Sequence, residues 1–210
     1  MMRASIPPSA ERGVALVITI MAVALLSALG LSLAMIIDTE TRISGQFAGG
    51  REVLYAADAA IEIAAQELVG VGDWNLVLAG EVVSAFVDGA PTGQRALGDG
   101  RLISLSAATD LANAESRPWG PNNPQWRLFA FGRFGRAYVI AWVADDPAEN
   151  DGDATRDGTG DDNPGAGIVV LRAEAFGLDG AHKVVEATVR RSSEAPLNPG
   201  IEMVSWHEIR

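Results

Sequence analysis

The feature that most constrains this 210-residue chain is a long uncharged stretch near its N-terminus. Residues 13–37 read GVALVITIMAVALLSALGLSLAMII, and only Thr19, Ser27 and Ser32 among them are markedly polar. A helix rises about 1.5 Å per residue, so a helix of this length crosses the hydrocarbon core of a bilayer. We therefore expect residues 14–37 to form a membrane-spanning helix.

The charges beside this stretch predict its orientation. Arg3 and Arg12 precede it, and Asp38 and Glu40 follow it. Positive flanks favour the cytoplasmic side, so we expect a single pass through the inner membrane with the N-terminus in the cytoplasm. A cleaved secretory signal is the alternative. Its apolar region usually has about 7–15 residues and ends at an A-x-A-like site, which this stretch lacks, so a retained helix is favoured.

Charge and cysteine content exclude several classes of function. The formal net charge is −11, which argues against nucleic-acid binding because that binding depends on neutralising phosphates. The chain has no cysteine, so it has no disulfide, thiolate-metal site or cysteine nucleophile. His182 and His207 are its two histidines, and we expect both at the surface or at a sheet edge. No nucleophile, base and orienting group can be assembled from the sequence, so an enzyme is not expected.

A second helix is predicted directly after the apolar stretch. Gly45, Gly49 and Gly50 predict a weak point or break within residues 38–50, since each glycine costs a helix about 1 kcal/mol. Residues 51–68 then have helical periodicity, and residues 38–70 together form the amphipathic continuation. Its expected buried face is rich in alanine and consists of Val53, Leu54, Ala57, Ile61, Ala64, Ala65 and Leu68.

The rest of the chain predicts a small α+β domain over residues 71–191. Residues 69–127 are expected to be irregular with a few short strands. From Trp126 the period becomes two, which predicts antiparallel strands over residues 136–144, 167–176 and 182–190, the last two joined by a tight connection at residues 177–180. Residues 192–210 are expected to be a linker with a C-terminal tail or edge strand, and Trp206 is expected to pack on the sheet.

An acidic segment at residues 145–162 is the candidate metal site. It holds seven Asp and one Glu against one Arg. Calcium takes six to eight oxygen ligands, which this segment could supply. The match to an EF-hand loop fails, because Arg156 stands where that loop needs glycine. The sequence leaves two interpretations open, a solvated loop with no cofactor and a calcium site. The candidate ligands are Asn150, Asp151, Asp153, Asp157, Asp161 and Asp162.

The ordered pattern resembles the type IV pilin-like proteins, and within them the PilX-type minor pilins. Two segments carry the resemblance. The first is Glu11-Arg12-Gly13-Val14-Ala15-Leu16-Val17 at the start of the apolar helix, and the second is residues 42–68, with the alanine-rich run Leu54-Tyr55-Ala56-Ala57-Asp58-Ala59-Ala60. Together they cover about the first third of the chain. The resemblance implies a pilin-like fold, with a long N-terminal helix followed by a small globular domain.

The resemblance also implies processing. Residues 1–13 would be a prepilin leader, cut by a prepilin peptidase between Gly13 and Val14, and Val14 would become an N-methylated terminus. Major pilins carry Glu at the fifth mature position, where this chain has Ile18. An acid in lipid is costly unless it has a partner, and a subunit with nothing above it needs none. The departure therefore favours a priming or tip-proximal role over that of the repeating subunit.

The expected function is that of a non-enzymatic minor pilin in type IV pilus assembly. Its partners would be other minor pilins and the major pilin, through the N-terminal helix, with a tip adhesin as a further candidate. After extraction from the inner membrane it would become periplasmic or extracellular in the pilus. One alternative is a K-type minor pseudopilin of type II secretion, which usually carries a large helical insertion. The other is a periplasmic binding or sensor domain on a single-pass signal anchor.

Overall fold

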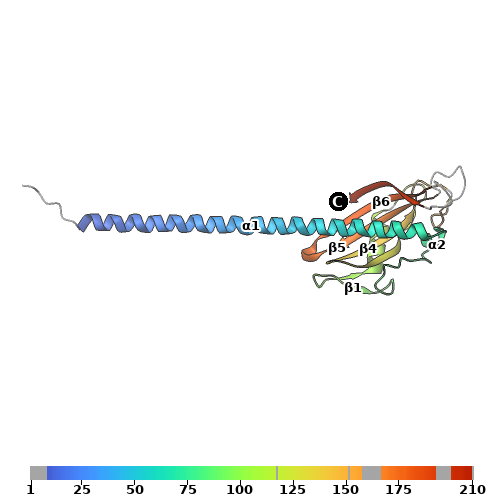
Figure 1. Cartoon of the computed structure of the whole chain (residues 1–210), viewed down its shortest axis with the longest axis horizontal. Coiled ribbons are helices and arrows are strands. Elements are labelled where there is room, and N and C mark those ends of the chain that lie inside the picture. Colours follow the sequence, from blue (N-terminus) through green and yellow to red (C-terminus); the bar gives the residue numbers. More distant parts are fainter. Residues whose placement is uncertain (1–8, 117, 151, 158–166, 193–199, 210) are drawn as a thin grey trace, which may run out of the picture. The chain divides into compact units, whose positions relative to one another are not determined.

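Helix α1 runs without interruption from Ser9 to Gly70 in the computed structural model (Figure 1). The structure describes residues 9–116, 118–150, 152–157, 167–192 and 200–209. These residues belong to two units, Met1–Phe47 and Ala48–Arg210, which are considered separately below. Residues 9–13 are the first helical residues of α1, and residues 1–8 lie outside the described residues.

The break predicted as one possibility within residues 38–50 does not occur, because α1 is helical throughout them. Gly45, Gly49 and Gly50 are all helical, and a Cβ at any of them would meet nothing within 4 Å. Extending an existing helix is far easier than starting one, so these three glycines do not end a helix that is long on both sides of them. An exposed ion pair one turn apart, Arg42 Nε to Asp38 Oδ2 at 3.0 Å, adds a small local contribution.

The second unit is built on one antiparallel sheet with the strand order β3-β4-β5-β6-β7 (Figure 1). The strands are β3 Arg127–Phe134, β4 Ala137–Asp145, β5 Ile168–Phe176, β6 His182–Ser192 and β7 Gly200–Ile209. The three predicted strands are confirmed as β4, β5 and β6, and the sequence did not delimit β3. Every residue of β4 and β5 is buried, because both faces of the sheet are covered at its centre.

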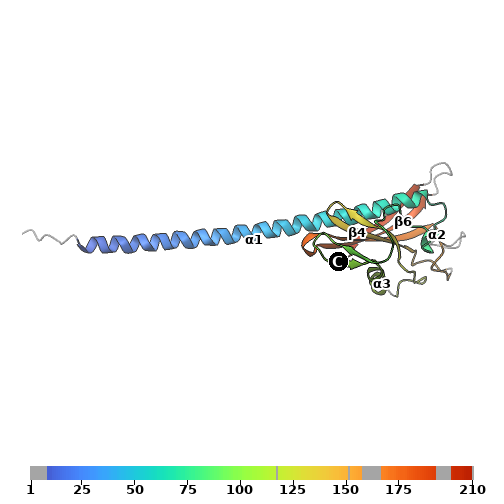
Figure 2. The same ribbon diagram turned by 90° about the horizontal axis from the view of Figure 1, so that it is seen from below.

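The C-terminal part of α1 covers one face of this sheet (Figure 2). Its predicted apolar face is confirmed, and Ala57, Ile61 and Ala64 are completely buried. They pack against alternate residues of the central strands, among them Ala141, Leu171, Ala173, Val185 and Ala187. Small side chains on both surfaces allow the helix backbone to lie close to the sheet. At the β5–β6 turn, a Cβ on Gly177 would lie 2.3 Å from Val53 Cγ2, which leaves room only for glycine.

The opposite face is covered by elements from the region predicted to be irregular. They are helix α3 Leu105–Glu115 and the small sheet of β1 Gln94–Ala96 and β2 Leu102–Ser104. The short helix α2 Asn75–Leu78 comes from the same part of the sequence, but it packs in the core on the α1 side of the sheet. Helix α3 was not predicted, since only Leu105 and Ala112 of it are buried. Its start does carry a local signal, because the Ser104 side chain caps it by accepting a hydrogen bond from the Ala107 amide.

The predicted β5–β6 connection is confirmed as a short turn. Residues Leu178–Gly180 form a single 3-10 turn in which Asp179 and Gly180 have φ of 53° and 79°. The amide of Gly177 donates to the carbonyl of Ala181 at 2.8 Å and closes the connection. Asp and Gly are residue types that tolerate this left-handed conformation, so the sequence itself specifies the turn.

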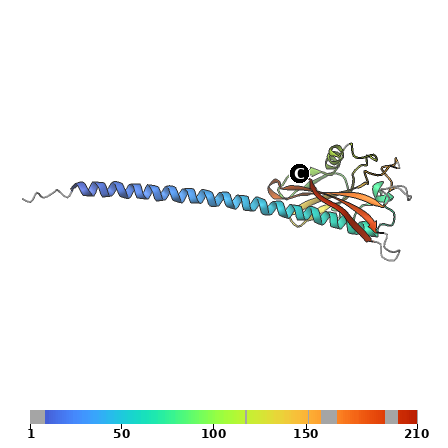
Figure 3. The ribbon, with the colours of Figure 1, turned by 90° about the horizontal axis from the view of Figure 1, so that it is seen from above.

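Strand β7 is the expected edge strand, paired with β6 alone (Figure 3). Trp206 stays partly exposed, and its indole Nε1 donates to Asp58 Oδ1 on α1 at 2.9 Å. The strand therefore contacts the helix as well as the sheet. The predicted linker falls on residues 193–199, which lie outside the described residues.

Candidate membrane-anchor and assembly site

The N-terminal part of α1 is an apolar surface on every side. All large apolar side chains from Val14 to Ile37 are exposed. Among the described residues, α1 is the helix long and apolar enough to serve as a single-pass membrane anchor. A helix that is apolar all round is suited to lipid or to the interior of a larger assembly.

Two of the three hydroxyl side chains in this surface, those of Thr19 and Ser32, are hydrogen-bonded within the helix itself. Thr19 Oγ1 donates to the Ala15 carbonyl at 2.8 Å, and Ser32 Oγ donates to the Ala28 carbonyl at 2.9 Å. An unpaired hydroxyl in hydrocarbon would be costly, and these bonds remove that cost for both side chains. The apolar character read from the sequence is thus reinforced by local hydrogen bonding.

The predicted processing residues lie at the beginning of this surface. Gly13 is helical and has open space around it, and Val14 and Ile18 are about 60% exposed. Among the described residues, none of these three belongs to a buried core cluster. Cleavage after Gly13, methylation of Val14 and the significance of Ile18 remain predictions.

The segment of α1 in the second unit has two distinct sides. One is the alanine-rich side that packs on the sheet. The other exposes Arg51, Tyr55, Glu62 and Gln66. Arg51 donates to the Tyr55 hydroxyl at 2.7 Å, one turn along the helix. This segment therefore serves as a structural part of the domain and offers a polar outer surface.

The predicted calcium ligands are not brought together in the described part of the chain. Asp153 accepts hydrogen bonds from the amide and hydroxyl of Thr155 and so stabilises a turn. Asp157 accepts from the Gly167 amide at 2.6 Å, and its own amide donates to Asn75 Oδ1. Asn150 is exposed, and Asp151, Asp161 and Asp162 lie outside the described residues. Within the described ranges, no group of three or more Asp, Glu or His side chains is arranged to hold a metal.

A different acidic pair is buried at the base of this segment. Asp145, the last residue of β4, and Glu149 are both fully buried, and their carboxyl groups lie within hydrogen-bonding reach of each other. Burial, with the hydrogen bond and negative charge of Glu149, raises the pKa of Asp145 to about 8. Burial also raises the pKa of Asp157, despite the opposing hydrogen bond from Gly167. Neither Asp145 nor Glu149 is among the ligands predicted from the sequence.

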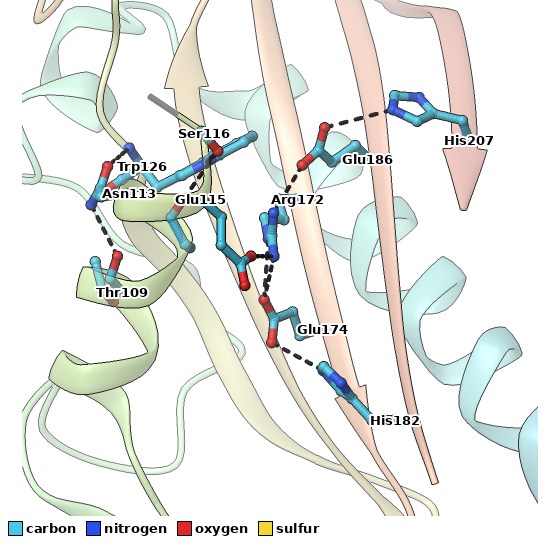
Figure 4. Close-up of polar contacts among 11 residues, drawn as sticks. Thr109, Asn113, Glu115, Ser116, Trp126, Arg172, Glu174, His182, Glu186 and His207 are labelled. Atoms are coloured by element: carbon cyan, nitrogen blue, oxygen red, sulfur yellow. Dashed lines mark hydrogen bonds and ion pairs between the residues drawn. The ribbon is translucent and has the colours of Figure 1, made fainter. Parts of the chain in front are cut away.

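A charged ladder crosses β5, β6 and β7 on the sheet face opposite α1 (Figure 4). Arg172 donates to Glu174 Oε1 and to Glu115 Oε2 of α3, both at 2.8 Å, and to Glu186 Oε1 at 3.1 Å. His182 Nε2 lies 3.1 Å from Glu174 Oε2, and His207 Nε2 lies 3.6 Å from Glu186 Oε2. Both histidines are exposed or at an edge, as expected, and each faces a carboxylate from another part of the sheet.

Glu174 and Arg172 of the ladder stay charged although both are buried. Burial opposes ionisation of Glu174, but hydrogen bonds from His182 and Arg172 outweigh it and lower the pKa of this carboxyl below its usual value of 4.5. Burial likewise opposes the charge on Arg172, and its carboxylate partners raise its pKa nevertheless. The arrangement is a structural ion network that joins α3 to three strands.

Next to the ladder, α3 is joined to the sheet by tryptophans (Figure 4). Asn113 accepts from the Trp126 amide at 2.8 Å, and Trp126 Nε1 donates to Ser116 Oγ at 2.8 Å. Trp142 Nε1 donates to Thr109 Oγ1 at 2.8 Å. Both indoles are buried, so they are part of the domain core.

Comparison with protein-family models, with curated proteins and with solved structures gives no match for this chain. Its function is therefore argued from its own residues.

Proposed function

We propose that this protein is a membrane-anchored minor pilin of the PilX type, which takes part in pilus assembly at a priming or tip-proximal position. The observation that carries the proposal is the division of α1 into two chemically different parts. Its first part exposes an uncharged apolar surface from Val14 to Ile37, and its last part packs an alanine-rich side on an antiparallel sheet. Gly13 and Val14 stand at the beginning of the apolar part.

The apolar surface would act in two settings. In the inner membrane it would contact lipid, and in a filament it would contact the equivalent helices of other minor pilins and of the major pilin. Small residues allow helices to approach closely in either setting. Those in this stretch are Ala22, Ala24, Ser27, Ala28 and Gly30. The domain of residues 48–210 would select the neighbouring subunits or present a tip adhesin.

The size of the domain favours the PilX type over the K type of type II secretion. K-type proteins usually carry a large helical insertion. In the described ranges, the helices after α1 are α2 with 4 residues, α3 with 11 and a single 3-10 turn. The ion ladder and the buried tryptophans hold the elements of the domain together. This role favours a pilus subunit over an enzyme.

The direct test is the N-terminus of the mature protein. We expect mass spectrometry of the full chain, made with an active prepilin peptidase, to find residues 1–13 removed and a methyl group on Val14. Gly13→Val should stop the cleavage, because the peptidase needs a small residue there. The matched control is Gly45→Val, which alters a helical glycine with similar open surroundings beyond the apolar stretch.

A second measurement separates the filament role from that of an anchored sensor. Cells that lack the gene should show fewer surface pili by electron microscopy, and the unaltered gene should restore them while the Gly13→Val gene should not. An intact Met1 in assembled material, or unchanged piliation in the deletion strain, would contradict the proposal.

A further inference from the structure

The two edges of the five-stranded sheet differ in how their backbone is paired. At the β3 edge, the Ser84 amide donates to the Phe129 carbonyl at 2.9 Å, and the Phe131 amide donates to the Phe86 carbonyl at 3.0 Å. At the other edge, β7 pairs with β6, and the described residues contain no other backbone partner for it. Alternate residues of an edge strand direct their amides and carbonyls outward, so β7 presents backbone groups with which an added strand can pair.

Strand β7 is also long and open on its side chains. Its central residues 202–207 are all exposed, and Met203, Val204 and Trp206 among them are large and apolar. Natural edge strands are usually short, charged, bulged or covered, because an open edge recruits other chains. A single bulge in the register leaves Val204 without a partner on β6, and the ladder continues on both sides of it. Most of this edge is therefore available for pairing.

A groove of about 400 Å³ lies where β7 meets α1 (Figure 3). The sheet lines it with apolar Val189, Ile201 and Met203, and α1 lines it with Glu62 and Gln66. The Glu62 side chain is exposed, and no ion pair to its carboxylate occurs in the described part of the chain. Lysine and arginine have an apolar stem and a cationic end, so either side chain suits a groove with apolar walls and one unpaired acid.

We propose that β7 and the groove beside it bind an extended segment of a partner protein. The segment adds a sixth strand to the sheet by pairing its backbone with β7, and it places a lysine or arginine side chain in the groove against Glu62. In this mode of recognition the backbone supplies affinity and the alternate side chains supply specificity. The formal net charge of −11 also favours a basic segment over an acidic one. The proposal goes beyond the pilin role and does not rest on it.

The probe is a fluorescein-labelled peptide of sequence STVTKTVTS, whose lysine and valines lie on one face of a strand. Fluorescence anisotropy with the full-length protein in detergent should show saturable binding. A peptide with glutamate in place of the lysine should bind at least about fivefold more weakly, as expected for the loss of one ion pair at a surface groove. Absence of saturable binding, or equal binding of the two peptides, would overturn the proposal.

Two matched variants locate the lysine of the peptide. Glu62→Lys should reverse the preference, so that the glutamate peptide binds more tightly than the lysine peptide. Glu52→Lys makes the same change at an exposed position of the same helix that does not line the groove, and it should leave the preference unchanged. An unaltered preference in Glu62→Lys would show that the groove does not receive the cation.

Hydrogen exchange on the unaltered chain tests the backbone pairing. The bound lysine peptide should slow exchange at the amides of residues 200–209 and leave those of residues 84–87 and 127–134 unchanged. The strand geometry also requires that N-methylation of either the threonines or the valines and lysine abolish binding while the other set is tolerated, since alternate amides face opposite edges. Protection at the β3 edge, or tolerance of both sets, would contradict an added strand at β7.

A second copy of this chain is the competing occupant of the edge. It would appear in sedimentation analysis as a dimer that forms with rising protein concentration and that protects residues 200–209 without any peptide. Such a dimer, unaffected by Glu62→Lys, would replace the partner segment proposed here.

Discussion

Arg172 is the residue on which the polar side of the sheet depends. Its side chain is 5% exposed and donates to three carboxylates, Glu115, Glu174 and Glu186. A buried ion network gains little over an apolar packing, but removing one partner leaves an uncompensated charge. Arg172 therefore specifies how α3 and the strands are arranged more than it adds to the net stability.

The lowered pKa of Glu174 predicts a loss of stability in acid. A carboxyl whose folded pKa lies below its unfolded value of 4.5 stabilises the fold above that value, and this contribution disappears as the pH falls through the folded pKa. At pH 6, Glu174→Gln should lower the free energy of unfolding by roughly 2 kcal/mol, since it weakens charged hydrogen bonds. Chemical denaturation at pH 6 and pH 3 measures the difference, which should shrink at pH 3.

The control for this prediction is Glu52→Gln, which removes an exposed carboxylate from α1. It should show the same pH dependence as the unaltered chain. A Glu174→Gln variant with an equal deficit at both pH values would mean that the carboxylate charge contributes nothing to the ladder.

At the level of elements, the alanine-rich side of α1 decides how closely the helix lies on the sheet. Ala57 is fully buried against the sheet, whereas Ala48 on the same helix is exposed. Ala57→Leu should destabilise the domain by about 1–3 kcal/mol, because overpacking displaces neighbouring side chains or the backbone. Ala48→Leu adds the same atoms without a clash and should change stability by less than about 0.5 kcal/mol.

Thermal unfolding of the two leucine variants measures this effect. A similar melting temperature for both would mean that the helix can move away from the sheet at no cost. That result would also contradict the close contact between Gly177 and Val53 at the β5–β6 turn.

The elements differ in how well they could be predicted. Strands β4, β5 and β6 have long β-branched or aromatic runs, and the turn at Asp179 and Gly180 has its own signal. Helix α3 contains Ser, Thr, Asn and Asp and buries few residues, so its period is weak. The N-cap residue Ser104 is the local signal that indicates where α3 begins. The glycines of residues 38–50 predicted a break that α1 does not have, because long helical segments on either side extend through them.

At the scale of the whole molecule, the chain joins an apolar helix to an acidic folded domain. The apolar stretch should hold the protein in a membrane. Leu26→Asp places a charge near the middle of that stretch, at a cost of about 2.5–3.5 kcal/mol for insertion. Cell fractionation should then find less of the protein in the membrane. Gln46→Asp, at an exposed position beyond the stretch, should leave the distribution unchanged. Equal membrane recovery for both variants would argue against a spanning helix.

The amino-acid sequence alone determined the long apolar N-terminal helix, the amphipathic segment, the central strands and the β5–β6 turn. Each of these follows from the length or period of a short stretch, which is a local property. The tertiary structure decided which polar groups meet. Trp206 contacts Asp58 across 148 positions, Asn122 contacts Asp145 across 23, and Arg172 contacts Glu115 across 57. Such pairs depend on strand register and on helix packing over the sheet, which are properties of the whole fold and not of any one segment.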